Sequence, residues 1–223
     1  MTEYLKKSEF WGAMILLSLH VILFPVVLNL VVLFFPDAFS LATMNLLYYV
    51  VSAVLSFVFL GGFLRRSFDT LLDNTFRCVS SFALGWVLYF VLAFVAGFIL
   101  QALSLNDLNP NEETIGQLLE QQRNYIVVMT VFLAPIVEEC IFRGGLFCGL
   151  HRKNRFLAYA VSIAAFSLYH VWQYALIDPK YLLFALQYIP ASFVLCWVYE
   201  RSGSIWTSIL FHMSFNAFTL LIS

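Results

Sequence analysis

The stretch APIVEECIFRGGLF, residues 134–147, places two glutamates and an arginine inside one continuous apolar segment. The rest of the chain gives the context, because 62% of its 223 residues are hydrophobic and only 11% are charged. A soluble domain is nearer half apolar and a quarter charged, so lipid is the expected solvent. Charged side chains in a lipid-embedded helix are disfavoured by about 2.5–3.5 kcal/mol each, even on the lenient scales. Glu138, Glu139 and Arg143 are therefore candidates for a functional site.

Seven apolar runs are long enough to cross roughly 30 Å of hydrocarbon as helices. They fall at about 10–35, 44–64, 79–103, 125–148, 156–177, 181–199 and 204–222. The first run is longer than a signal-peptide core and lacks a small-residue cleavage site, so we expect it to remain as a span. No segment is left over for a soluble domain. The sequence therefore predicts one all-α, polytopic membrane domain over residues 1–223.

The basic residues between the runs predict how the chain is oriented. Alternate loops carry nine Lys and Arg on the N-terminal side of the membrane and two on the other side. Because basic loops remain in the cytoplasm, we expect an integral membrane protein with a cytoplasmic N-terminus and an external C-terminus.

Residues 104–124 form the one substantial polar insertion. Ile115, Leu118 and Leu119 follow helical spacing after an Asn-Glu-Glu start, which favours a short interfacial helix. The segment is interpreted either as a surface connector or as a gate beside the route by which a substrate enters.

Two other features narrow the function. The net charge of −1, without a basic tract, gives no sign of nucleic-acid binding. The four cysteines, Cys78, Cys140, Cys148 and Cys196, lack CxxC spacing and indicate neither a disulfide framework nor a zinc–thiolate site. Cys140, Cys148 and Cys196 lie in apolar runs and are interpreted as small hydrophobic residues.

The two adjacent glutamates have different expected partners. Glu139 and Arg143 are four residues apart on one helix face, in the favourable order for an ion pair. Glu138 lies about 100° further around the helix, so it needs another partner or is protonated. Gly144, Gly145 and Gly149 follow and would let a neighbouring helix approach closely.

Three further polar residues lie in the later runs. His170 is in the fifth run, and His212 is in the seventh with Asn216 four residues on, on the same helix face. Each alone is most simply a hydrogen-bonded core residue. Counted at about 1.5 Å per residue, however, Glu138, His170 and His212 lie at one depth. A carboxylate and two imidazoles in one layer predict an acid–base site that activates water, with imidazole and amide donors for an oxyanion.

Three motifs carry a family resemblance: EExxxR at Glu138, Glu139 and Arg143, FxxxH at Phe166 and His170, and HxxxN at His212 and Asn216. In this order in a polytopic chain, they resemble the CPBP family of intramembrane endopeptidases. This family comprises CAAX proteases and bacteriocin-processing (Abi) proteins and is related to the Ras-converting CAAX endoprotease. The resemblance covers about residues 125–222.

The resemblance implies roles for these residues. Glu138 and His170 would activate water, His212 and Asn216 would hold the oxyanion, and Glu139, Arg143 and Phe166 would support the site. It also implies a peptide or membrane-protein substrate and a bacterial cell membrane, with peptide processing or bacteriocin self-immunity as the role. The family has been called metalloproteases, so Glu138, His170 and His212 are possible Zn²⁺ ligands. The chain lacks the HExxH motif, and a glutamate-activated water is favoured.

Two other functions stay open at this point. A proton-coupled transporter would also use glutamates and histidines inside the membrane, although no repeat relates the halves of the chain. A non-catalytic immunity or scaffold protein would use the same polar cluster only to hold its helices together.

Overall fold

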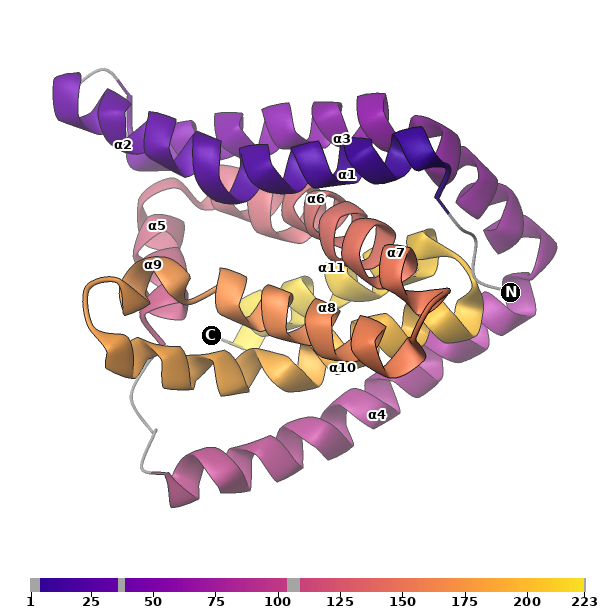
Figure 1. The fold of residues 1–223 in the computed structure, drawn as a ribbon. Helices are drawn as coiled ribbons and strands as arrows, with labels where there is room; N and C mark the ends of the chain where they lie inside the picture. Colours follow the sequence, from indigo (N-terminus) through magenta and orange to yellow (C-terminus); the bar gives the residue numbers. More distant parts are fainter. Residues whose placement is uncertain (1–4, 36–38, 104–108, 223) are drawn as a thin grey trace.

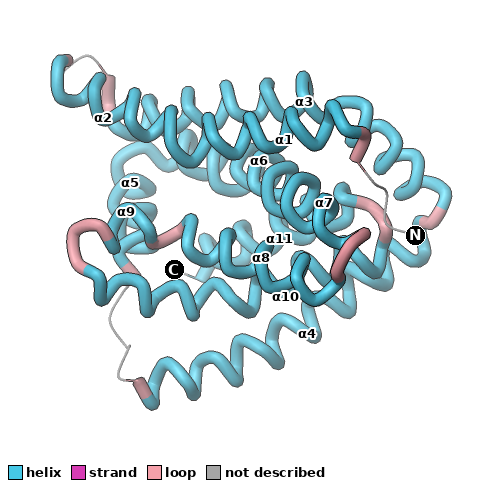
Figure 2. Tube along the Cα trace, in the orientation of Figure 1, coloured by secondary structure: helices cyan, strands magenta, loops and turns pink. Residues whose placement is uncertain are grey.

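The computed structural model describes residues 5–35, 39–103 and 109–222, and every regular element within these ranges is a helix (Figures 1 and 2). The α-helices are α1 (Lys7–Ser18), α2 (Phe24–Phe34), α3 (Leu41–Asp73), α4 (Thr75–Ala102), α5 (Pro110–Val127), α6 (Ala134–Glu138), α7 (Cys148–His151), α8 (Arg155–Tyr169), α9 (Trp172–Ala175), α10 (Ala185–Ser202) and α11 (Ile205–Ile222). Three π-helical segments, η1 (Leu19–Leu23), η2 (Val128–Leu133) and η3 (Glu139–Phe147), continue these helices, and η4 (Pro179–Phe184) is a 3₁₀ helix. The all-α prediction is confirmed.

Each of the seven predicted runs coincides with a helical segment, but the segments differ in length. Five are long and apolar enough to cross a membrane: Lys7–Phe34, Leu41–Asp73, Thr75–Ala102, Pro110–His151 and Pro179–Ser202. The other two, Arg155–Tyr169 and Ile205–Leu221, are shorter apolar helices. Five candidate spans are thus present in the described part of the chain, and the count of seven stays a prediction.

The outer surface is apolar, as a lipid environment requires. Along α4, Val87 is 61% exposed, Phe94 68% and Phe98 60%. Soluble monomers rarely expose contiguous apolar surface on this scale. The helix thus presents one long face suited to hydrocarbon.

The fourth span, from α5 to α7, lies inside the bundle. In Figure 1 α1 and α3 cover one side of it, while α8, α10 and α11 lie on the other and α4 packs outside α10 and α11. Small residues allow α1 to come close. A methyl group on Gly145 would lie 3.1 Å from Ala13 Cβ, and one on Gly149 would lie 2.6 Å from the Phe10 ring. The close approach predicted for these glycines is confirmed.

Two prolines inside spans follow π-helical turns. Pro25 follows η1 and Pro135 follows η2, each as the second residue of the next α-helix. Proline lacks an N–H and its ring clashes with the carbonyl four residues earlier. The wider turn before each proline accommodates both effects within a continuous helix.

The polar insertion folds as α5, whose backbone kinks at Gln122 before the fourth span continues. Leu118 is buried, and the partly buried Ile115 and Leu119 pack beside it against a cluster that includes Ala42 on α3. The helical face predicted for this segment is confirmed over the described residues, while residues 104–108 lie outside them.

The fifth run ends earlier than predicted. Helix α8 stops at Tyr169, and His170 is its C-cap residue, not a residue inside a span that reaches 177. The physical reason is local, since the His170 ring Nδ1 bonds the Phe166 carbonyl, one of the last carbonyls that lose their helical partner at such an end. The chain then turns through α9 and η4 into α10.

Candidate active site

Glu139 is the most extensively bonded residue of the polar cluster. It is fully buried, and its carboxylate accepts from Arg143 Nη1 at 3.0 Å and from Ser208 Oγ at 2.6 Å. His212 Nδ1 lies 3.0 Å from Glu139 Oε1, the oxygen that also accepts from Arg143. The ion pair predicted from the four-residue spacing is confirmed. Glu139 thus connects two helices that are far apart in sequence, η3 and α11.

Arg143 is also fully buried and extends the cluster to a third helix. Its Nη2 donates to the carbonyl and the hydroxyl of Ser192 on α10, at 3.1 and 3.0 Å. Its guanidinium carbon lies 4.4 Å from the centre of the Phe166 ring, in cation–π contact. Phe166 therefore supports the arginine with its ring and His170 with its backbone carbonyl.

The positions of the two histidine rings determine which nitrogen carries the proton. The Phe166 carbonyl can only accept, so His170 Nδ1 donates to it at 2.9 Å. Glu139 already accepts from Arg143 and Ser208, so His212 Nδ1 donates to its carboxylate. In the neutral form, both rings then present an Nε2 lone pair.

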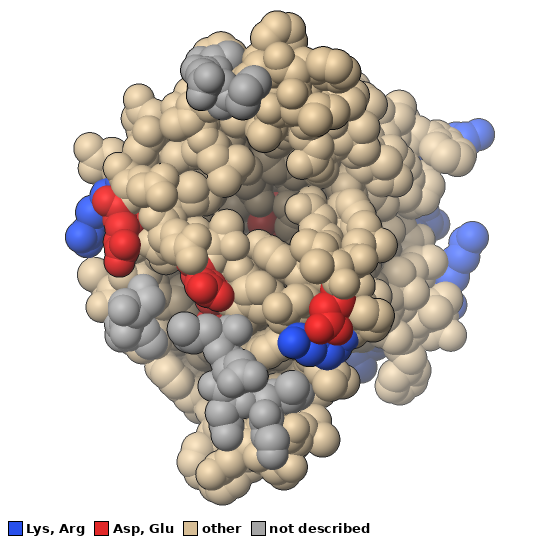
Figure 3. Space-filling view, turned by 90° about the vertical axis from the view of Figure 1, so that its left-hand side faces the viewer, with Lys and Arg blue, Asp and Glu red and all other residues tan. Residues whose placement is uncertain are grey.

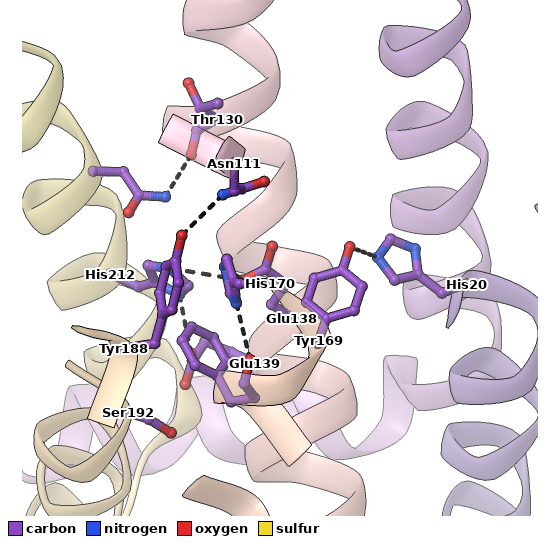
Figure 4. Close-up of polar contacts among 12 residues, drawn as sticks. His20, Asn111, Thr130, Glu138, Glu139, Tyr169, His170, Tyr188, Ser192 and His212 are labelled. Carbon is purple, nitrogen blue, oxygen red and sulfur yellow. Dashed lines mark hydrogen bonds and ion pairs between the residues drawn. The ribbon is translucent and has the colours of Figure 1, made fainter. Parts of the chain in front are cut away.

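Both Nε2 atoms face the same oxygen of Glu138 (Figure 4). His212 Nε2 lies 3.8 Å and His170 Nε2 lies 4.0 Å from Glu138 Oε2. These separations are too long for direct hydrogen bonds but suit a bridging water. Glu138 is only 4% exposed, and among the described residues its Oε2 has no hydrogen-bond partner. The predicted convergence of Glu138, His170 and His212 is confirmed.

Asn216 lies one turn beyond His212 on α11 but bonds elsewhere. Its Nδ2 donates to the Thr130 carbonyl in η2 at 2.8 Å. This bond uses one of the two amide hydrogens and leaves the other for a ligand. Asn216 thus joins α11 to the fourth span one turn beyond His212, and its oxyanion role stays a prediction.

Sequence reasoning missed three residues of this cluster: Ser208, Ser192 and Tyr188. Ser208 precedes His212 by four residues, so Ser208, His212 and Asn216 form one stripe along α11, and that spacing was a usable signal. Ser192 and Tyr188 gave no such signal because they reach the site from α10. Tyr188 stacks on His170 with ring centres 4.3 Å apart (Figure 4).

His20 is a buried hydrogen-bonded residue, and its network approaches the site. Its Nδ1 bonds Ser52 Oγ and its Nε2 bonds the Tyr169 hydroxyl, each at 2.9 Å. The Tyr169 hydroxyl also lies 3.1 Å from that of Tyr49. Because Tyr169 precedes His170, this network ties the first two spans to the site. The other histidine outside the cluster, His151, pairs with Glu200 at 2.8 Å.

The same residues can be tested as a zinc site. Zinc–nitrogen and zinc–oxygen distances of about 2.0–2.2 Å put the ligand atoms of a tetrahedral site roughly 3.3–3.6 Å apart. The two separations to Glu138 Oε2 are wider, at 3.8 and 4.0 Å. No group of three His, Cys, Asp or Glu side chains in the described ranges is placed to hold a metal ion. The arrangement as it stands does not fit a bound zinc ion. All four cysteines are free and buried.

Comparisons with known proteins point to one family. Residues 121–218 match the family described as type II CAAX prenyl endopeptidase Rce1-like. The protein named "Putative membrane peptidase YdiL" of Bacillus subtilis (strain 168) is 31% identical over 98 residues, which are 44% of this chain and 36% of that protein. The UPF0177 protein YvdC of Lactococcus lactis subsp. lactis (strain IL1403) is 21% identical over 140 residues, 63% of this chain and 51% of that protein.

These matches span about half or less of the length of the relatives. No solved structure gives a significant match. All seven residues of the three motifs fall inside the matched segment. Residues 121–218 are therefore similar to the Rce1-like family of type II CAAX prenyl endopeptidases.

Proposed function

We propose that this chain is an intramembrane endopeptidase of the CAAX type that hydrolyses a peptide bond with a water activated by Glu138. One observation carries the proposal: two imidazole Nε2 atoms face a buried carboxylate oxygen that has no partner in the described structure. A buried carboxylate oxygen without a partner is costly, and inside a membrane such a group marks a functional site. The family match over the same residues supports this assignment.

The catalytic steps follow from the positions of the side chains. Water binds between Glu138 and the two Nε2 atoms, gives one proton to Glu138, and its oxygen bonds to the substrate's carbonyl carbon. His170 orients this water through Nε2 while the Phe166 carbonyl holds its ring. As the carbon–nitrogen bond breaks, Glu138 passes its proton to the leaving nitrogen. The products are a new carboxyl group and a new amine.

The negative oxygen of the intermediate is stabilised from α11. The second amide hydrogen of Asn216 donates to it, because the first is held by the Thr130 carbonyl. The Nδ1 hydrogen bond to Glu139 holds the His212 ring with Nε2 turned toward the reacting atoms. Preorganised donors of this kind contribute about 2.7–4 kcal/mol each to the transition state.

The proposed setting is a bacterial cell membrane, with a cytoplasmic N-terminus and an external C-terminus. The distribution of basic residues supports this orientation. A role in peptide processing or bacteriocin self-immunity rests on the family resemblance alone.

Replacing Glu138 by Gln tests the proposal. Purified Glu138→Gln protein should lose cleavage of a test peptide by at least about 100-fold, the range for a general base, while it still inserts and folds. Metal analysis and a chelator accompany the assay, and metal-free protein should keep its activity. Full activity in Glu138→Gln would contradict the assignment, and loss of activity on chelation would point to a metal-dependent reaction. A variant that lacks cleavage but keeps its cellular effect would favour the scaffold function.

A further inference from the structure

The basic residues lie at one end of the folded molecule. Of the twelve Lys and Arg, nine belong to the end formed by the N-terminus and the α3–α4, α7–α8 and α10–α11 connections (Figure 1). Arg123 and Lys180 lie toward the opposite end, and Arg143 is buried within the bundle. Because the positive-inside rule places basic loops in the cytoplasm, the basic end is the cytoplasmic one.

A hollow opens on the surface at the opposite end of the molecule. Figure 3 views the molecule from the side that carries the α5 and α9 region, and shows a hollow in the middle of this face with acidic colour at its floor. Residues other than Lys, Arg, Asp and Glu form most of its walls, while acidic side chains, some beside basic ones, stand around it. The candidate site keeps some exposure in keeping with this, since the His170 side chain is 16% exposed and that of Glu138 is 5% exposed.

A short run of polar contacts connects that end to the site. Asn109 and Asn111, where α5 begins, both donate to the Tyr188 hydroxyl, at 2.9 and 3.1 Å. Tyr188 in turn stacks on His170. Only one side chain therefore lies between the start of α5 and a histidine of the site.

The basic end is closed beneath the same site. Phe147 and Tyr199 are fully buried with ring centres 5.8 Å apart, and Phe147 stacks on His151 near the basic α7–α8 connection. Ser67 on α3 and Ser204, the residue before α11, have hydroxyls 3.2 Å apart. This packing lies on the basic side of the bundle, whereas the hollow opens on the opposite side.

We infer that the peptide bond is presented to Glu138 from the extracytoplasmic side of the membrane, through the hollow beside α5 and Tyr188. The substrate is then a polypeptide whose cleaved segment lies at or just inside the outer membrane surface. The inference rests on the proposed protease function for its chemistry, and on the geometry of the opening for its direction.

Introduced cysteines test the direction without any need for activity. The four native cysteines are buried, so a membrane-impermeant maleimide should leave the unmodified protein unlabelled. Glu113→Cys on α5 and Lys153→Cys at the basic end replace matched exposed residues, and Asn111→Cys replaces a half-buried one beside Tyr188. In sealed right-side-out vesicles, Glu113→Cys and Asn111→Cys should label, whereas Lys153→Cys should label only after permeabilisation. The reverse pattern would overturn the inference.

A cleavage assay tests the consequence. A water-soluble quenched peptide that the detergent-purified protein cleaves is added outside sealed vesicles, with Glu138→Gln vesicles as the control. Right-side-out vesicles should cleave it without permeabilisation, and cleavage by inside-out vesicles alone would refute the direction. If purified protein cleaves no peptide, the proposed function fails, and the labelling pattern alone decides the side from which the hollow opens.

Discussion

Glu138 and Glu139 are adjacent in sequence, yet their surroundings in the bundle are opposite. Glu139 contacts Arg143, Ser208 and His212, while Glu138 Oε2 faces two histidines across a gap. The i,i+4 spacing predicted the Glu139–Arg143 pair because both residues belong to one helix. The contacts to α10 and α11 could not be predicted in this way, since they depend on how helices pack.

Replacing each of the two glutamates should therefore change the free energy of unfolding by a different amount. Glu139→Gln leaves the buried Arg143 charge uncompensated, which should lower the free energy of unfolding by about 3–5 kcal/mol. Glu138→Gln breaks no hydrogen bond to Oε2 and should leave stability within about 1 kcal/mol. Thermal or denaturant unfolding in detergent measures both variants. Equal destabilisation by the two would contradict the division of roles.

The Tyr169 hydroxyl should make a measurable contribution to stability. Tyr169→Phe removes the partner of His20 Nε2 and the contact with Tyr49 while it keeps the ring. Hydrogen bonds between membrane helices contribute about 0.6 kcal/mol on average and at most about 1.7 kcal/mol, so we expect a loss of roughly 1–2 kcal/mol. Tyr174→Phe, which removes a single bond to Thr114 away from this network, is the matched control. A larger loss in the control would argue against the network.

At the scale of the helices, hydropathy located each run but not its ends. Helix α8 stops at Tyr169 because His170 bonds the Phe166 carbonyl, an interaction that a hydropathy window does not register. The polar segment before the fourth span was predicted as a helix because its apolar residues recur at helical spacing. The spacing of these apolar residues gave no sign of the backbone kink at Gln122.

Because Gly12 lies in a close helix contact and Gly97 does not, we expect alanine to affect stability differently at the two positions. A methyl group on Gly12 would lie 2.8 Å from Phe59 Cβ, an atom fixed to the α3 backbone. Gly12→Ala should therefore destabilise the protein by about 1–3 kcal/mol. Gly97→Ala in α4 meets nothing within 4 Å and should be neutral or stabilising by up to about 1 kcal/mol. Unfolding of the two variants in detergent gives the comparison, and matching effects would contradict a tight α1–α3 contact.

At the scale of the whole molecule, the segment that matches the family contains only part of the residues that form the buried core. It covers residues 121–218, but the buried core also contains Leu16 from α1 and Leu60 and Phe63 from α3. Composition predicted a membrane protein, and the similar depths of Glu138, His170 and His212 along their helices predicted that these residues lie close together. Neither could show that α1 and α3 cover the helix that carries the glutamates, because an apolar face in lipid does not specify its neighbour.

A chain limited to residues 109–223 should accordingly fail to form a stable monodisperse protein in detergent. It lacks the α1 and α3 surfaces that pack on η3 and α6. Size-exclusion chromatography after expression measures this outcome, and co-expression with residues 1–103 should restore the complex, since membrane helices can associate after separate insertion. A stable, active fragment would show that the first three spans are dispensable.

The π-helical winding of η3 has a consequence for how this protein can vary in length. A turn closed by i→i+5 hydrogen bonds holds one residue more than an α-turn, and such turns occur often at functional sites. A one-residue deletion between Glu139 and Phe147 can therefore be absorbed by tightening the turn, with the flanking helix left in phase. Homologous chains are expected to differ by single-residue gaps at this place more readily than anywhere in the uninterrupted α-helix of α3.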